Sequence, residues 1–263
     1  MSWRRNLKRE AKTAWKRLED VLSYDLIDDP YKGSPVPVSS PVFPSLLPFP
    51  WLTSSAGVQT TPLHRQDVVP AARMLRRAMS KHPPEVLKQS VKQICLFRAL
   101  QLEGEPVGGT CDVSGGVLYL TYAPDIEGGE EQIEVAFHHE LAHLLLNNYR
   151  SHWAEEAWFA LNPIAFNYGT GGLDAIKSGT ASGEFSEALG LKGFLSQYAA
   201  SSPDEDFCSI VEGIFGCRPG FWEVADAFPN INSKAKLAMT FFRHLHEDYS
   251  EARFRSYDSH QRA

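Results

Sequence analysis

The residues with the clearest chemical potential are two histidines and a glutamate in the run His139-Glu140-Leu141-Ala142-His143. Histidines four positions apart on a helix lie on one face, so both imidazoles can bind a single metal ion. Glu140 then falls beside the ion, close enough to hold a water molecule without binding the metal. This spacing is typical of zinc hydrolases that cleave peptide bonds. We therefore expect one Zn²⁺ per chain, bound by His139 and His143, with Glu140 as general base.

A catalytic zinc ion keeps three protein ligands and one open position, so a third ligand must come from elsewhere. The metzincin pattern requires Gly at position 146 and His at position 149. The chain has Leu146 and Tyr149 there, which excludes that class. An aspzincin would use Asp174 after Gly169-Thr170, but the spacing is one residue too long. Glu155 and Glu156 fit a solvated helix face better than a metal site.

The better candidate is the segment 203–212 (PDEDFCSIVE), whose acidic residues 204–206 open an expected helix over 204–214. Ser202 or Asp204 can cap this helix, and Pro203 suits its first turn. If the helix packs across the HExxH helix, a carboxylate in its first turn can reach the metal. The same acidic residues also fit an ordinary helix start that complements the helix dipole. The residues alone do not separate these two interpretations.

The elements that position these residues follow from hydrophobic periodicity. Helices are expected at 69–80, 84–92, 131–147, 152–160, 204–214, 220–227 and 233–248. Strands are expected at 93–100 and 117–122, the second rich in β-prone residues and stopped by Pro124. The 117–122 strand is either an edge along which an extended peptide could lie or an interior strand. The fold class is α+β, with a small sheet followed by a mostly helical C-terminal half.

Three segments in this order resemble a known family: 138–143 (HHELAH), 193–199 (GFLSQYA) and 205–207 (EDF). The chain is similar here to zinc-binding metallopeptidases of the gluzincin (zincin) type, including the catalytic domain of anthrax lethal factor. The resemblance covers about residues 115–215 and implies a zincin-like catalytic domain with a small mixed sheet. It implies that Glu205 is the third zinc ligand. It also implies that Tyr198, seven residues earlier, is catalytic and can donate a hydrogen bond to a developing oxyanion.

One position departs from the family pattern. The second glutamate of the family's E-x-F-A-E segment falls on Ser209, and the alanine before it is Cys208. We expect this change to affect fine tuning more than metal binding. Glu212, one turn further along the same helix face, can take the place of the missing carboxylate. Asp206 and Glu212 are therefore the candidates for supporting the metal ligands.

Composition divides the chain into four parts. Residues 1–27 contain a basic amphipathic helix, and 28–66 form a Pro- and Ser-rich linker. Residues 67–250 form the catalytic domain, and 251–263 a polar tail. Residues 1–20 could dock on an anionic membrane, on a partner protein or on the protein's own core.

Bulk properties exclude several classes of protein. The 263 residues carry a net charge of −6, with 43% hydrophobic and 22% charged residues, so nothing indicates nucleic-acid binding. No apolar run is long enough to span a membrane, and no secretory signal is recognisable. The four cysteines lack CxxC spacing and fit buried, reduced thiols. Cytoplasmic residence is expected, or export without a signal peptide.

The primary hypothesis is a zinc metalloendopeptidase acting on a protein or peptide. One alternative is a zinc-stabilised interaction module without turnover, although the intact Glu140 argues against it. Another is a delivered protease effector or toxin whose basic N-terminal helix handles transport or docking.

Overall fold

The computed structural model describes residues 30–41, 57–126 and 128–259. The chain divides into two compact units at Ser34, and everything described below belongs to the unit from Pro35 onward. The predictions for the basic helix at 1–27 and for docking through residues 1–20 lie outside the described residues.

The sheet is built around its longest strand, β3 (Gln93–Leu102). On one side β3 pairs in parallel with β1 (Val38–Ser39) and antiparallel with β2 (Val58–Pro62). On its other side the first half of β3 pairs in parallel with β6 (Val117–Thr121), and its last residues pair antiparallel with β4 (Glu105–Val107). The mixed sheet and the helical C-terminal half confirm the predicted α+β class.

Strand β6 lies inside the sheet and not at its edge. Its five residues are all buried, because β3 covers one side and β5 (Gly109–Asp112) pairs antiparallel along the other. The edge strand on this side is therefore β5, a four-residue segment rich in small and polar residues. Of the two alternatives left open for 117–122, the interior one is correct.

Two strands fall within the stretch predicted as linker. Val58, Thr60 and Thr61 are β-branched, and β2 pairs with β3 over most of its length. The two residues of β1 also join β3. Short strands of this kind are set by the partner strand, so composition alone points to a linker where the sheet has in fact begun.

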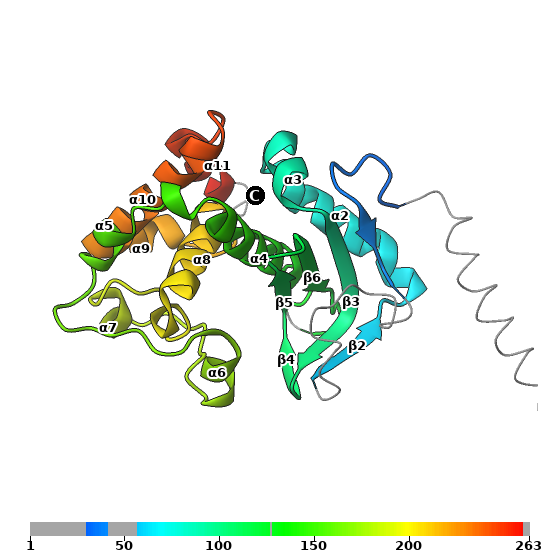
Figure 1. Cartoon of the computed structure of the whole chain (residues 1–263), viewed down its shortest axis with the longest axis horizontal. Coiled ribbons are helices and arrows are strands. Elements are labelled where there is room, and N and C mark those ends of the chain that lie inside the picture. Colours follow the sequence, from blue (N-terminus) through cyan, green and yellow to red (C-terminus); the bar gives the residue numbers. More distant parts are fainter. Residues whose placement is uncertain (1–29, 42–56, 127, 260–263) are drawn as a thin grey trace, which may run out of the picture. The chain divides into compact units, whose positions relative to one another are not determined.

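Helix α4 (Gln132–Asn148) carries the HExxH sequence and lies between the sheet and the C-terminal helices (Figure 1). Helix α2 (Val68–Ser80) packs alongside it, and α3 (Pro84–Ser90) follows α2. Apolar residues surround α4 on nearly every side, from Ile133 and Phe137 to Leu146, and all of these are buried. A helix that is apolar all round belongs in an interior. Its polar residues His138, His139 and Glu140 are consequently buried as well.

The C-terminal half is helical apart from its loops. The principal helices are α8 (Pro203–Ile214), α9 (Phe221–Ala227), α10 (Pro229–Leu245) and α11 (Glu251–Ser259), preceded by short elements at α5 (Glu155–Phe159), α6 (Gly172–Lys177) and α7 (Glu187–Gly190). Single 3₁₀ turns lie at Arg65–Asp67, Arg150–His152 and Ala199–Ser201. Within the part of the chain that the structure describes, no helix is long and apolar enough to cross a membrane.

Helix α11 corrects the predicted polar tail at 251–263. Phe254 is buried, and its ring packs against Phe215 and Phe242. Only one or two apolar side chains per turn face inward, so the segment has a polar composition although it closes the core.

A buried ion pair fixes α8 against α10. Neither the Asp206 nor the Lys234 side chain is exposed to solvent, and Lys234 Nζ lies 2.7 Å from Asp206 Oδ2. The same oxygen accepts hydrogen bonds from Trp158 and Tyr168, and Lys234 also donates to the carbonyl of Gly193. Asp206 thus links Trp158, Tyr168 and Lys234 to α8. Because its carboxylate is taken up by these partners, it does not lie among the metal-ligand candidates.

Replacing Lys234 with methionine should destabilise the protein by about 3–5 kcal/mol, because the Asp206 carboxylate would stay buried without its counter-charge. Urea unfolding followed by circular dichroism measures the change in free energy. The matched control is Lys236→Met on the exposed side of α10, which should change stability by less than ~0.5 kcal/mol. Equal stability of the two variants would contradict the prediction.

Candidate metal centre

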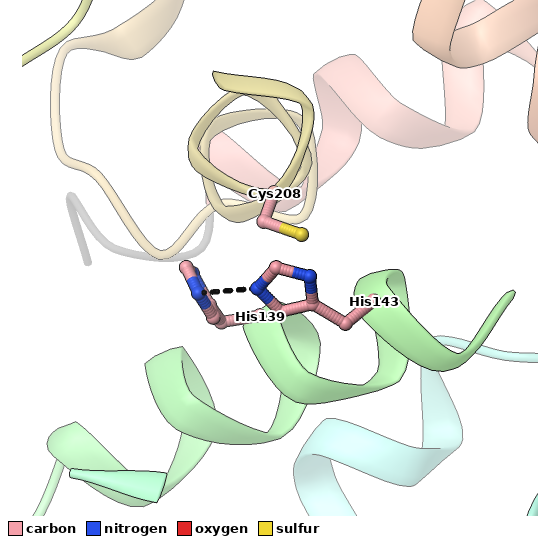
Figure 2. A group of neighbouring side chains, drawn as sticks. All are labelled: His139, His143 and Cys208. Carbon is pink, nitrogen blue, oxygen red and sulfur yellow. Dashed lines mark hydrogen bonds between the residues drawn. The ribbon is translucent and has the colours of Figure 1, made fainter. Parts of the chain in front are cut away.

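His139 and His143 place their imidazoles one turn apart on the same face of α4, toward α8 (Figure 2). Their ring centroids are 4.9 Å apart, and the two Nε2 atoms are 3.2 Å apart. The helical spacing that suggested a shared ion therefore brings two ligand atoms together.

Glu205 reaches the same point from the first turn of α8. Its Oε2 lies 3.0 Å from His139 Nε2 and 3.3 Å from His143 Nε2. Helix α8 begins as expected: Pro203 occupies its first turn and the Ser202 hydroxyl accepts a hydrogen bond from the Glu205 amide. This cap fixes the turn that presents Glu205 to α4.

The three ligand atoms fit a zinc ion. Around a tetrahedral centre with bonds of about 2.0–2.1 Å, neighbouring ligand atoms lie roughly 3.3 Å apart, close to the separations of 3.0, 3.2 and 3.3 Å seen here. Glu205 Oε2 is buried and has no hydrogen bond of good geometry. A cation at this point would satisfy that oxygen, which otherwise carries a desolvation cost.

The pKa shifts of the ligand candidates indicate a site that favours positive charge. Burial alone would raise the pKa of Glu205, but the two histidines hold it well below its usual range. The pKa of His139 lies well above its usual value, because its close contacts with the Glu205 and Glu212 carboxylates outweigh the effect of burial. The carboxylates therefore draw a positive charge to this point, and a divalent ion can supply it in place of a proton.

Glu212 supports His139 from the opposite side of the ring. Its Oε1 accepts a hydrogen bond of 2.7 Å from His139 Nδ1, which leaves Nε2 facing Glu205. Glu212 Oε2 is held by Arg218 at 2.7–2.8 Å. Ser209, one turn earlier, is buried and its hydroxyl has no hydrogen-bond partner. Glu212 is thus the carboxylate that contacts the histidine.

Glu140 lies beside the ligands in the wall of a cleft of about 800 Å³. Burial raises the pKa of its carboxyl, and the neighbouring His139 and His143 offset part of that rise. A Cβ atom at Gly109 would lie 3.1 Å from Glu140 Cγ, so the edge strand approaches α4 closely because this residue is glycine. The close approach of β5 keeps Glu140 between the strand and the ligands.

Tyr198 also lines the cleft, with its ring stacked on His139 at 6.0 Å between centroids. Burial and the neighbouring negative charge of Glu205 raise its pKa, so the phenol is protonated at neutral pH. Its position next to a ligand could not be derived from the sequence without the family spacing.

Cys208 is a second candidate ligand that the sequence pattern did not reveal. It projects from α8 toward the histidine pair (Figure 2), and its Sγ lies within 4.8 Å of a nitrogen of each ring. Burial raises the pKa of the thiol well above its usual value, whereas the histidines hold the pKa of Glu205 well below its own. A carboxylate that is already ionised loses no proton on binding a cation, which favours Glu205 as the third ligand.

The other candidates lie elsewhere. Asp174 is on α6 and joins none of the metal-compatible groups found among the described residues. Glu155 pairs with Arg150 at the surface. His138 shares a hydrogen bond with His82 in the core, away from the cleft. All four cysteines are free thiols.

A second group of possible ligands comprises Glu134, His138 and Cys217. Here Lys81 Nζ lies 2.6 Å from Glu134 Oε1, and Arg77 Nε lies 3.3 Å from Oε2. The positive charge that a metal would bring is already supplied by these side chains. This group is therefore a buried ion-pair network and not a second metal site.

Compared by sequence, the chain matches no protein-family model and no curated protein. Compared by structure, it is similar to a crystal structure of a protein from Bacteroides caccae named a "putative zinc-binding metallo-peptidase". The TM-score is 0.55 with 15% sequence identity, and the match covers 92% of each chain. The two proteins thus share a fold along nearly their whole lengths, which agrees with the predicted zincin-like fold.

Zinc content separates the three ligand candidates. We expect the purified protein to bind zinc stoichiometrically, Glu205→Ala to lose most of it, and both Cys208→Ala and Asp174→Ala to retain it. Elemental analysis after dialysis against trace zinc measures the content. Retention of zinc by Glu205→Ala together with its loss from Cys208→Ala would instead assign the thiol as ligand.

Proposed function

We propose that this protein is a zinc-dependent metallopeptidase that hydrolyses peptide bonds of a protein or peptide substrate. The observation that carries the proposal is the convergence of His139, His143 and Glu205 on one point, with Glu140 buried beside them in the wall of a cleft. The two histidines and the glutamate would form the gluzincin ligand set, which is the set implied by the resemblance of the sequence to the catalytic domain of anthrax lethal factor.

His139, His143 and Glu205 would hold the ion, and the cleft leaves a further position for substrate. Zinc bound there supplies a Lewis acid that polarises the scissile carbonyl and makes a water molecule acidic at neutral pH. Three protein ligands with an open fourth position are typical of catalytic zinc, whereas structural zinc is closed by four.

Glu140 is the proposed general base. Its carboxylate takes a proton from the attacking water and delivers it to the amine that leaves when the peptide bond breaks. Burial raises its pKa toward the working pH, which suits a group that must both accept and release a proton. A purely structural zinc has no use for a general base, so the presence of Glu140 favours catalysis.

Tyr198 is the proposed oxyanion donor. Its protonated hydroxyl lies next to Glu205 and faces the cleft, where it can donate a hydrogen bond to the carbonyl oxygen as negative charge develops. This role depends on placement and not on acidity, which is consistent with its raised pKa.

The edge strand suggests how a substrate lies in the cleft. Gly109, Thr110 and Cys111 of β5 line the cleft, and β5 has no strand on its outer side among the described residues. An extended peptide can add to such an edge through main-chain hydrogen bonds. Much of the remaining wall is apolar, including Leu102, Val107, Val135, Leu173 and Ile176.

Two alternatives remain to be tested against this proposal. A zinc-stabilised module without turnover would keep the metal but have no use for Glu140. A delivered effector would be the same enzyme with an additional transport or docking role for the basic segment at residues 1–27. Cytoplasmic residence, or export without a signal peptide, stays a prediction from the sequence.

Replacing Glu140 with glutamine should retain zinc and lower kcat/KM for peptide cleavage by about 10²–10⁴-fold, because the amide cannot accept the proton. A proteomic cleavage screen on wild type and variant, with zinc measured in both, makes the comparison. Identical cleavage profiles in two zinc-loaded proteins would rule out the enzymatic role of Glu140.

Replacing Tyr198 with phenylalanine should lower kcat by about 10²–10³-fold with little change in KM, since the hydrogen bond forms mainly in the transition state. Steady-state kinetics on a peptide found in the cleavage screen measure both constants, and zinc content serves as the control. A rise in KM at constant kcat would assign Tyr198 to substrate binding instead.

A further inference from the structure

We propose that Arg218 is a positioning residue that fixes both a metal ligand and the loop next to the proposed oxyanion donor. The inference rests on the proposed function, because it assigns a role at the same site. Arg218 follows α8 and lines the cleft with 26% of its side chain exposed. Arg218 lies outside the HExxH motif and outside the segments that carry the family resemblance.

The first contact is with the carboxylate that orients His139. Arg218 Nε and Nη2 donate to Glu212 Oε2 at 2.8 and 2.7 Å, and the other oxygen of Glu212 accepts the 2.7 Å bond from His139 Nδ1. The guanidinium therefore holds Glu212 in one orientation. Glu212 in turn fixes the His139 ring through Nδ1, so that the other ring nitrogen, Nε2, points toward Glu205. Carboxylates behind ligand histidines fix ring orientation in this way.

The second role of Arg218 is to balance negative charge in the site. Three carboxylates, those of Glu140, Glu205 and Glu212, are buried around the histidine pair. Among the described residues that line the cleft, Arg218 is the one arginine or lysine. One divalent ion and one guanidinium together balance three carboxylates. Without Arg218, the buried Glu212 carboxylate would have only the imidazole of His139 as its partner.

The third contact reaches the loop before Tyr198. Arg218 Nη1 donates to the carbonyl of Gly183 at 3.3 Å, and the Tyr198 amide donates to the carbonyl of Ser182 at 3.1 Å. Arg218 and Tyr198 thus hold neighbouring carbonyls of the same loop. The loop is anchored on one side to the carboxylate behind His139 and on the other to the residue proposed to stabilise the oxyanion.

These contacts are all with the protein itself, so Arg218 acts through Glu212 and through the loop. A direct contact between Arg218 and substrate is the competing role. The two differ in whether Arg218 affects the metal in the absence of substrate, and in whether its effect depends on Glu212.

The test compares Arg218→Met, Arg218→Lys, Glu212→Gln and the Met/Gln double variant. Zinc affinity is measured by competition with a chromogenic chelator, and kcat and KM with a peptide substrate. Arg218→Met should weaken zinc binding by about 10–100-fold and lower kcat more than it raises KM. Arg218→Lys should recover part of both losses. In zinc affinity the double variant should be no worse than Glu212→Gln, because Arg218 affects the metal through that carboxylate.

The matched control is Arg255→Met, which removes a surface arginine paired with Glu251 and Asp226, remote from the cleft residues. It should leave zinc affinity unchanged, and thermal melting of all variants reports whether they fold. Unchanged or tighter zinc binding in Arg218→Met would overturn the inference. So would a loss confined to KM, or additive losses of zinc affinity in the double variant.

The outcome for the proposed function is separate. Wild-type protein that binds zinc but cleaves no peptide would refute the peptidase, while the zinc measurements on the variants would still decide the role of Arg218. Wild-type protein that binds no zinc would overturn both.

Discussion

The packing of α8 across α4 is the contact on which the site depends, and one imidazole lies at its centre. Glu205 and Glu212 are seven residues apart on α8 and therefore share a face of that helix. Glu205 lies against Nε2 of His139, and Glu212 bonds to Nδ1 of the same ring. A slide or rotation of α8 by one residue would break both contacts at once. The helix pair is thus held in register by the residues that form the site, and the Ser202 cap fixes the turn from which Glu205 projects.

Burying three carboxylates in one place is costly unless positive charge accompanies them. The apolar surroundings of α4 leave little water to share that cost, since residues before and after the motif pack on the sheet and the neighbouring helices. Elsewhere in the same domain two buried carboxylates are matched by a lysine, Glu134 by Lys81 and Asp206 by Lys234. Among the described residues no lysine or arginine pairs with Glu205, and its ion-pair partners are two histidines. This difference is a physical reason to expect a metal ion at Glu205.

Sequence periodicity predicts the parts of this structure that are locally determined. The HExxH helix and the capped start of α8 follow from apolar spacing and from Ser202-Pro203, and both helices appear close to their expected bounds. The short strands β1, β2, β4 and β5 depend on pairing with β3 or β6, so their own residues carry little signal. For the same reason the edge of the sheet could not be identified from the sequence. Arg218 and Cys208 were missed because their relation to His139 exists only once α8 has packed on α4, and Tyr198 was found only through the family resemblance.

The nature of the fourth zinc position is what separates an enzyme from a zinc-stabilised module. A closed structural site would need a fourth protein ligand, and Cys208, one turn from Glu205, is the side chain best placed to supply it. Burial raises the pKa of that thiol well above its usual value, so losing its proton to bind the metal carries an extra free-energy cost. On the opposite side, β5 approaches α4 through Gly109 and leaves the cleft beside Glu140. Under the proposed function, the open cleft and the buried carboxyl of Glu140 beside the ligands suit a metal that exchanges water for substrate.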